Sequence, residues 1–161
     1  MRYTRFAAMI ATSTLVMLAL MYANSYAADH LFYSQTRSWM ALVMGAAMAL
    51  VMLAFMWDMY EGRRIKLAIV AGALLVGAGA LWMVRSQTAV DDVDYMKAMI
   101  PHHSIAILTS RRAEIRDPRV RELADEIIAA QVREIDEMKT LIAELEANPV
   151  GQDAPRLPPG E

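Results

Sequence analysis

Cysteine is absent from the chain of 161 residues. Its absence excludes disulfide bonds, thiolate zinc sites, iron–sulfur clusters and cysteine nucleophiles. An excess of positive charge is also absent, because 16 Lys and Arg residues are balanced by 18 Asp and Glu residues. We therefore expect no nucleic-acid partner, since binding to phosphates needs a basic surface. The sequence contains no nucleophile motif, phosphate-binding loop or cofactor fingerprint, and we do not expect an enzyme.

Charge of either sign is scarce in the first half of the chain. Residues 1–85 carry seven Lys or Arg and three Asp or Glu, whereas residues 86–161 carry nine and fifteen. The first half is nearly all apolar, and the second half is a mixture of apolar and charged residues. This division predicts a membrane domain over residues 1–85, followed by an acidic domain outside the bilayer.

Three long apolar runs stand out in the first half, at residues 6–28, 38–57 and 67–84. A helix that crosses the hydrocarbon core needs about 20 apolar residues, or about 17 at least. All three runs therefore qualify as membrane spans. The first run can also be interpreted as a cleaved signal peptide, because Ser25-Tyr26-Ala27 resembles a small-x-small cleavage site. The run is long for a signal peptide, which favours a first span that stays in the protein. Both interpretations leave the second half of the chain on the same side of the membrane.

Basic residues in the short loops predict the orientation of these spans. They precede the first run and follow the second, at Arg2, Arg5, Arg63, Arg64 and Lys66. The loop between these two runs, residues 29–37, contains a single Arg. The bias predicts a protein of the bacterial inner membrane with a cytoplasmic N-terminus and a periplasmic C-terminal domain.

One feature of the membrane half is a candidate metal site. Methionine recurs every four residues in the second run, at Met40, Met44, Met48, Met52 and Met56. We interpret this row as packing or lipid-facing residues, because Met is flexible and apolar. A ladder of thioethers for a soft ion such as Cu(I) is the alternative. His30 lies in the loop after the first run, and we expect it to be solvated.

Residues 86–148 are predicted to form two helices joined by a tight turn. Apolar residues recur at helical spacing on both sides of Asp117-Pro118, which supplies an N-cap and a first-turn proline. The two helices are expected to form an antiparallel hairpin. A tail follows it, residues 149–161, which we expect to be disordered. A two-helix unit has a small core and needs an added stabilising element. Dimerisation into a four-helix bundle, metal binding and docking on the membrane helices are the alternatives.

Polar and sulfur-containing residues interrupt the apolar faces of this hairpin. They are Met96, Met99, His102 and His103 in the first helix, and Gln131, Glu134 and Met138 in the second. Pro101 precedes the two histidines and is expected to kink the helix there. The antiparallel return of the chain places His103 and Glu134 at similar heights, because they lie at similar distances from the turn.

Thioether and imidazole groups together favour copper, and Cu(I) more than Cu(II). Silver is expected to follow Cu(I), and zinc is a further candidate because imidazole and carboxylate also bind it. The predicted first ligands are Met99, His103 and Met138, the next are His102 and Met96, and Gln131 and Glu134 are predicted to orient the imidazoles. The alternative is structural, with the histidines hydrogen-bonding the second helix across an apolar seam.

Two strings in the hairpin resemble domain-of-unknown-function family 305. They are Met99-Ile100-Pro101-His102-His103 in the first helix and Gln131, Glu134-Ile135 and Met138 in the second. The resemblance covers about residues 90–147, and the membrane half looks like a membrane-anchored branch of that family. It implies a ferritin-like helical domain outside the cytoplasm and, in some members, copper binding and resistance through Met and His. Larger members carry two such hairpins and this chain carries one, so a complete bundle requires association.

The sequence thus predicts an all-α protein with three transmembrane helices and an antiparallel helical hairpin, a ferritin-like half-bundle completed by dimerisation. Its predicted function is to bind copper or a related soft ion in metal homeostasis or resistance. The expected partners are the lipid bilayer, a second copy and envelope metal-handling proteins. The alternative is a structural or interaction module that binds no metal. An enzyme that uses the histidine pair for acid–base or metal chemistry is the least supported hypothesis.

Overall fold

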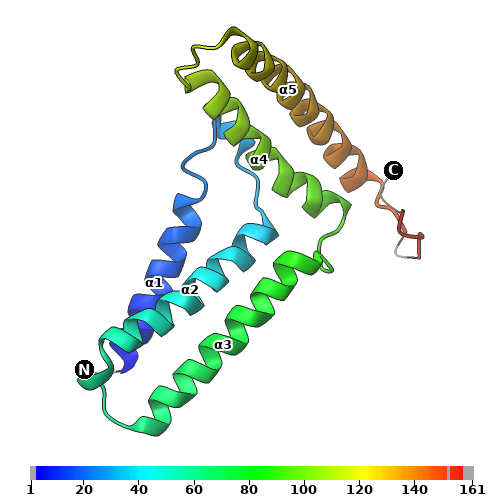
Figure 1. Ribbon diagram of the computed structural model, residues 1–161. Helices are drawn as coiled ribbons and strands as arrows, with labels where there is room; N and C mark the ends of the chain where they lie inside the picture. The colour runs from blue at the N-terminus through cyan, green and yellow to red at the C-terminus, as the bar shows by residue number, and fades with distance from the viewer. Residues whose placement is uncertain (1–2, 152, 158–161) are drawn as a thin grey trace.

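The computed structural model describes residues 3–151 and 153–157. These residues form five α-helices and no β-strand. The helices are α1 (Tyr3–Leu20), α2 (Gln35–Phe55), α3 (Arg63–Ser86), α4 (Asp92–Arg112) and α5 (Pro118–Ala147). Two short 3-10 helices, η1 (Ala28–His30) and η2 (Trp57–Met59), lie in the connections on either side of α2. The predicted all-α fold is confirmed, and Figure 1 shows a three-helix body with the α4–α5 hairpin across one end.

The helices α1, α2 and α3 are each long and apolar enough to cross a membrane. They run in alternating directions, and α2 packs against both α1 and α3 (Figure 1). Large apolar side chains such as Leu75 and Trp82 face outward, with 75% and 60% of their surface exposed. Such a surface is favourable in lipid and unfavourable in water. The three predicted spans are therefore present as helices that suit a bilayer.

Helix α1 is shorter than the first predicted span, residues 6–28, because tertiary contacts end it at its eighteenth residue. The Arg37 guanidinium donates to the Met21 carbonyl at 2.8 Å and lies over the Tyr22 ring at 4.5 Å. The Tyr22 hydroxyl accepts a hydrogen bond from the Ser34 N–H at 2.9 Å. These contacts satisfy groups at the helix end that would otherwise need a further turn of helix. The segment between α1 and α2, residues 21–34, is therefore structured. We call it the outer loop, because it lies at the end of the three-helix body that faces the hairpin (Figure 1).

The methionine row of α2 is half-buried along its whole length. Met52 and Met56 pack against a cluster formed by Phe6, Leu53 and Tyr60. The structure thus supports the packing interpretation at this end of the row. The ion-ladder alternative stays a prediction.

The helices α4 and α5 form the predicted antiparallel hairpin (Figure 1). The Asp91 carboxylate caps α4 by accepting from the Asp94 N–H at 2.8 Å. The Asp117 carboxylate caps α5 by accepting from the Arg119 N–H at 2.9 Å. Each cap satisfies a backbone donor that has no partner inside its helix. The core between the two helices consists of Met96, Ile100, Ile107, Ile135 and Ile142.

Pro101 lies in the middle of α4, and the helix continues through it. Its side chain is fully buried, as is that of Ile100. Burial of the ring offsets part of the free energy lost with the missing backbone donor. The kink expected at this residue stays a prediction.

The outer loop packs on the hairpin. Its Phe32 side chain lies against the hairpin core, and η1 contacts α4. The expectation that His30 is solvated is wrong, because its side chain is 12% exposed and its Nδ1 lies 3.0 Å from Ser104 Oγ. The loop therefore covers part of the apolar face that an isolated two-helix unit would leave in water.

The chain after α5 has no regular structure over its described part. Residues 148–151 and 153–157 contain no helix or strand. Residues 152 and 158–161 of the predicted tail lie outside the described residues, as does Arg2 of the predicted N-terminal basic cluster. Disorder of the tail stays a prediction.

Candidate metal-binding groove

An open groove of about 500 Å³ lies between α4 and α5. The residues that line it are Asp92, Tyr95, Met96, Met99, His103, Glu134, Glu137, Met138, Leu141 and Leu145. On each helix they follow one another mainly at intervals of three or four residues, so each helix presents one face to the groove. The structure thus brings the predicted ligands Met96, Met99, His103 and Met138 to one place, together with Glu134.

His102 does not line the groove. Its side chain is exposed, and its ring centroid lies 6.3 Å from that of His103. Successive residues of an α-helix point about 100° apart, and the exposed His102 side chain lies outside the groove that His103 lines. A ligand held in the groove contacts His103, and His102 lies outside that arrangement.

The His103 side chain is 12% exposed and has a partner at each ring nitrogen. Nδ1 lies 3.0 Å from the Met99 carbonyl oxygen, and Nε2 lies 2.8 Å from Glu134 Oε2. Both oxygens are acceptors when Glu134 is ionised. The two hydrogen bonds therefore require two protons. Either both are on the His103 ring, as an imidazolium facing the Glu134 carboxylate, or the ring and Glu134 carry one each and both are neutral. Metal binding through Nε2 requires this ring to separate from Glu134.

Glu134 is held toward His103 by a second contact within α5. Gln131 Nε2 donates to Glu134 Oε2 at 3.4 Å, which is at the long end of the hydrogen-bond range. The Glu134 side chain is 44% exposed, so it can turn toward water when it leaves the imidazole. Glu134 thus makes the contact with His103 that its predicted orienting role requires.

The three methionines of the groove differ in burial. Met96 is 6% exposed and belongs to the hairpin core, whereas Met99 and Met138 are half-buried. A thioether is neutral and soft, and it suits Cu(I) or silver better than zinc, magnesium or calcium. Over residues 3–151 and 153–157, no three or more His, Asp and Glu side chains gather into a group that could hold a metal ion. The candidate soft donors of the groove are therefore its thioethers, together with the imidazole of His103.

Two acidic residues of the groove were not among the predicted site residues. Asp92 lies four residues before Met96, and Glu137 lies three residues after Glu134. The same spacing rule that grouped the predicted ligands also identifies these two. Their carboxylates add negative charge to the groove, which favours a cationic ligand.

Comparison with known proteins identifies the hairpin. Residues 92–157 match the family model described as Domain of unknown function (DUF305). The α4–α5 hairpin is a DUF305 domain. The resemblance seen in the sequence is thus confirmed for this part of the chain, and the match to DUF305 leaves α1, α2 and α3 outside.

A relative of the chain is an uncharacterized protein of Acanthamoeba polyphaga mimivirus, which is 41% identical over 66 residues. The alignment covers 40% of this chain and 43% of the viral protein, so the chain spans less than half the length of that relative. No solved structure matches the chain.

Proposed function

We propose that this protein is a membrane-anchored binder of Cu(I), or of a related soft ion, in metal homeostasis or resistance of the bacterial envelope. The observation that carries the proposal is the gathering of thioethers and one imidazole around the DUF305 groove, from Met96, Met99, His103 and Met138. Sulfur and imidazole are ligands that Cu(I) prefers, and silver binds similarly. The resemblance of the hairpin to copper-binding members of its family supports the same assignment.

Met99, His103 and Met138 are the proposed ligands. Met99 and Met138 are half-buried, and their flexible thioethers can turn into the groove without loss of core packing. His103 supplies Nε2 once it leaves Glu134, and the proton of the Nε2–Glu134 hydrogen bond is released to water. The Glu134 carboxylate then balances the added positive charge from outside the ligand set, and the Gln131 amide donates a hydrogen bond to it. Binding therefore releases protons and weakens as the pH falls.

A Cu(I) titration of the purified full-length protein, in competition with a chelator, tests the site. The double change His103→Ala with Met99→Leu should abolish tight binding. It should leave helicity nearly intact, because Leu fills the volume of Met at low cost. The matched control is His102→Ala, which removes an exposed imidazole outside the groove and should keep the wild-type affinity. Equal affinity in the wild type and the double variant contradicts the assignment of these two ligands.

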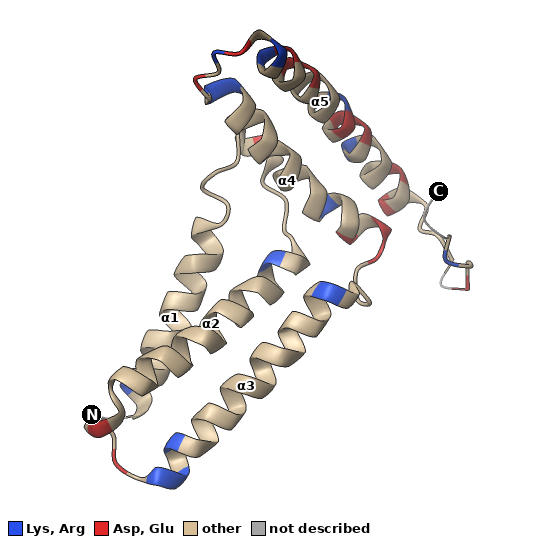
Figure 2. Cartoon of the chain, in the orientation of Figure 1, with Lys and Arg blue, Asp and Glu red and all other residues tan. Residues whose placement is uncertain are grey.

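The proposed location of the hairpin is outside the cytoplasm. Figure 2 shows basic residues clustered at the end of α3 that lies away from the hairpin. The positive-inside rule assigns that end to the cytoplasm. A C-terminal alkaline phosphatase fusion should be active, and a fluorescent protein that folds only in the cytoplasm should stay dark. The reverse result contradicts both the orientation and the envelope function.

A second candidate function is favoured by the hydrogen bond between His103 and Glu134. A hydrogen bond across the hairpin can fix the alignment of α4 and α5 without a metal. Exposed apolar side chains on α5, at Leu123, Ile127 and Leu141, also suit pairing with a second copy. The protein is then an interaction module. In that case copper binding is nil in the wild type and the double variant, and the double change lowers stability or shifts the oligomer seen by light scattering.

A further inference from the structure

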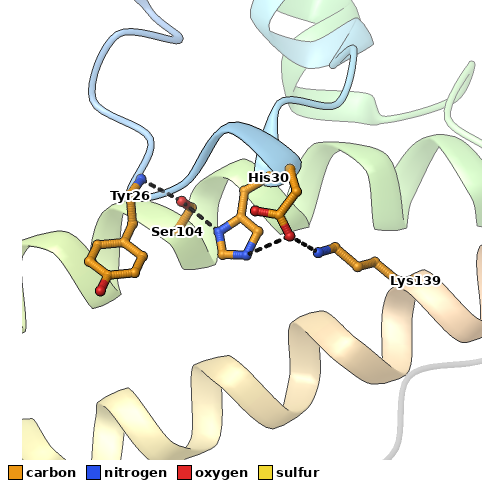
Figure 3. A network of polar contacts seen from close by, with 5 residues as sticks. Tyr26, His30, Ser104 and Lys139 are labelled. Carbon is orange, nitrogen blue, oxygen red and sulfur yellow. Dashed lines mark hydrogen bonds and ion pairs between the residues drawn. The ribbon is translucent and has the colours of Figure 1, made fainter.

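The outer loop is bound to the DUF305 hairpin through a buried hydroxyl, as Figure 3 shows. The Tyr26 N–H donates to Ser104 Oγ at 2.7 Å, and Ser104 on α4 has 0% of its surface exposed. His30 Nδ1 lies 3.0 Å from the same oxygen. Arg111, in the last turn of α4, donates to the Tyr26 hydroxyl at 2.6 Å. Neither Ser104 nor Arg111 lines the metal-binding groove.

A neutral His30 satisfies these contacts best. The Ser104 oxygen accepts from the Tyr26 N–H, and the Ser104 hydroxyl proton can go to His30 Nδ1. The ring then carries its proton on Nε2, which lies 3.9 Å from Asp29 Oδ2. A protonated His30 instead turns a second N–H toward the Ser104 oxygen, and the hydroxyl proton loses its acceptor. Protonation therefore weakens the contact between the loop and α4.

The surroundings of His30 also favour the neutral ring. Burial is the largest effect, and it lowers the pKa of His30 below the ordinary value of 6.5. Lys139 on α5 acts in the same direction, whereas the carboxylates of Asp29 and Asp136 raise the pKa. The Lys139 ammonium lies 2.6 Å from Asp29 Oδ2 and neutralises much of the nearest carboxylate. The docked loop thus disfavours the charged imidazole.

We propose that the outer loop is a pH-sensitive latch, closed on the DUF305 hairpin while His30 is neutral and released when His30 is protonated. Release returns the charged ring to water. Because docking lowers the pKa of His30, the latch has its full stability above about pH 6.5 and loses it as the pH falls through the lower value of the docked ring. Phe32 and the contact between Arg111 and Tyr26 define the closed position.

Spin-label distances in the full-length protein, in lipid nanodiscs and metal-free buffer, test the latch. The chain has no cysteine, so Leu31→Cys in the loop and Arg133→Cys in α5 can be labelled selectively. Both positions are exposed. We expect one short-distance population at about pH 7.5 and its partial loss to longer distances at about pH 5. The variant His30→Asn should keep the short distance at both pH values, because its amide oxygen accepts from Ser104 without titrating.

The matched control is His102→Asn, which removes an exposed imidazole from α4 and should leave the pH response unchanged. A wild-type distance that stays the same at both pH values overturns the proposal, and so does a wild-type pH response in His30→Asn. A second variant, Ser104→Ala, removes the shared hydroxyl and should show the longer distances already at about pH 7.5. A wild-type response from that variant also overturns the latch. Metal-free buffer keeps the result independent of copper binding.

Discussion

His103 and His30 are equally buried and have different hydrogen-bond partners. Each side chain is 12% exposed. His103 lies between a carbonyl oxygen and the Glu134 carboxylate, so its two contacts need two protons. His30 lies against the Ser104 hydroxyl, which can donate, and burial holds the pKa of this ring below its usual value. Equally buried histidine sites can therefore need different numbers of protons, because their hydrogen-bond partners differ.

The His103 site and the His30 site both involve helix α4, through its consecutive residues His103 and Ser104. His103 faces the groove toward α5, and Ser104, the next residue of α4, faces the outer loop. A rotation of about 100° between neighbouring residues separates the two directions. One helix can therefore hold a ligand site on one face and a contact with the membrane domain on another. The variants below separate these two sites, from the largest expected effect to the smallest.

Loss of the Ser104 hydroxyl should have the largest effect on stability. Ser104→Ala leaves the Tyr26 N–H without its partner and removes the contact of His30 Nδ1. Each unpaired buried group costs about 1–3 kcal/mol, so we expect a loss of about 2–4 kcal/mol in the stability of the docked loop. Amide exchange of the loop segment measures this loss. Copper affinity should stay at the wild-type level, and a fall in affinity would show that the two sites are coupled.

The converse variant removes the carboxylate from the His103 site. In Glu134→Gln the amide can donate to His103 Nε2, so the ring needs only one proton of its own. We expect a loss of about 1 kcal/mol in stability, because Glu134 is partly exposed. Copper binding should release fewer protons and depend less on pH than in the wild type. Calorimetry in buffers of different ionisation enthalpy counts these protons, and an unchanged count would place the second proton elsewhere.

The smallest effects are expected from the charges around His30, and they have opposite signs. Asp29 raises the pKa of His30, so Asp29→Asn should move release of the loop to lower pH. Lys139 lowers the pKa, so Lys139→Met should move release to higher pH. Both shifts should be small, because the Asp29 carboxylate is largely exposed and solvent screens its interactions. The spin-label distance followed against pH measures them, and shifts of the same sign would contradict this electrostatic account.

The helices and the groove could be predicted from the sequence because both depend on local spacing. Met99 and His103, like Glu134 and Met138, are one helical turn apart, and the predicted cap at Asp117 fixes where α5 begins. Periodicity also grouped His102 with this site, although its adjacent position on the helix turns it outward.

The environment of His30 could not be predicted in the same way. Its partner Ser104 is 74 residues away, and no local pattern reports such a contact. The early end of α1 has a similar cause, since Arg37 and Ser34 reach back across the outer loop to Met21 and Tyr22. Tertiary contacts here override an apolar run that by itself favours a longer helix.

The three membrane helices are unequal in length, with 18, 21 and 24 residues in α1, α2 and α3. At about 1.5 Å per residue, α1 is about 27 Å long and α3 about 36 Å. A hydrocarbon core of about 30 Å fits α1 upright, whereas α3, whose uncharged part is residues 67–84, extends beyond the core at its charged ends, Arg63, Arg64 and Arg85. Helix α1 leads into the outer loop, and α3 leads into α4. In a bilayer, a change in hydrophobic thickness would therefore act differently on the two attachments of the hairpin, and the orientation of the DUF305 domain would depend on the surrounding lipid.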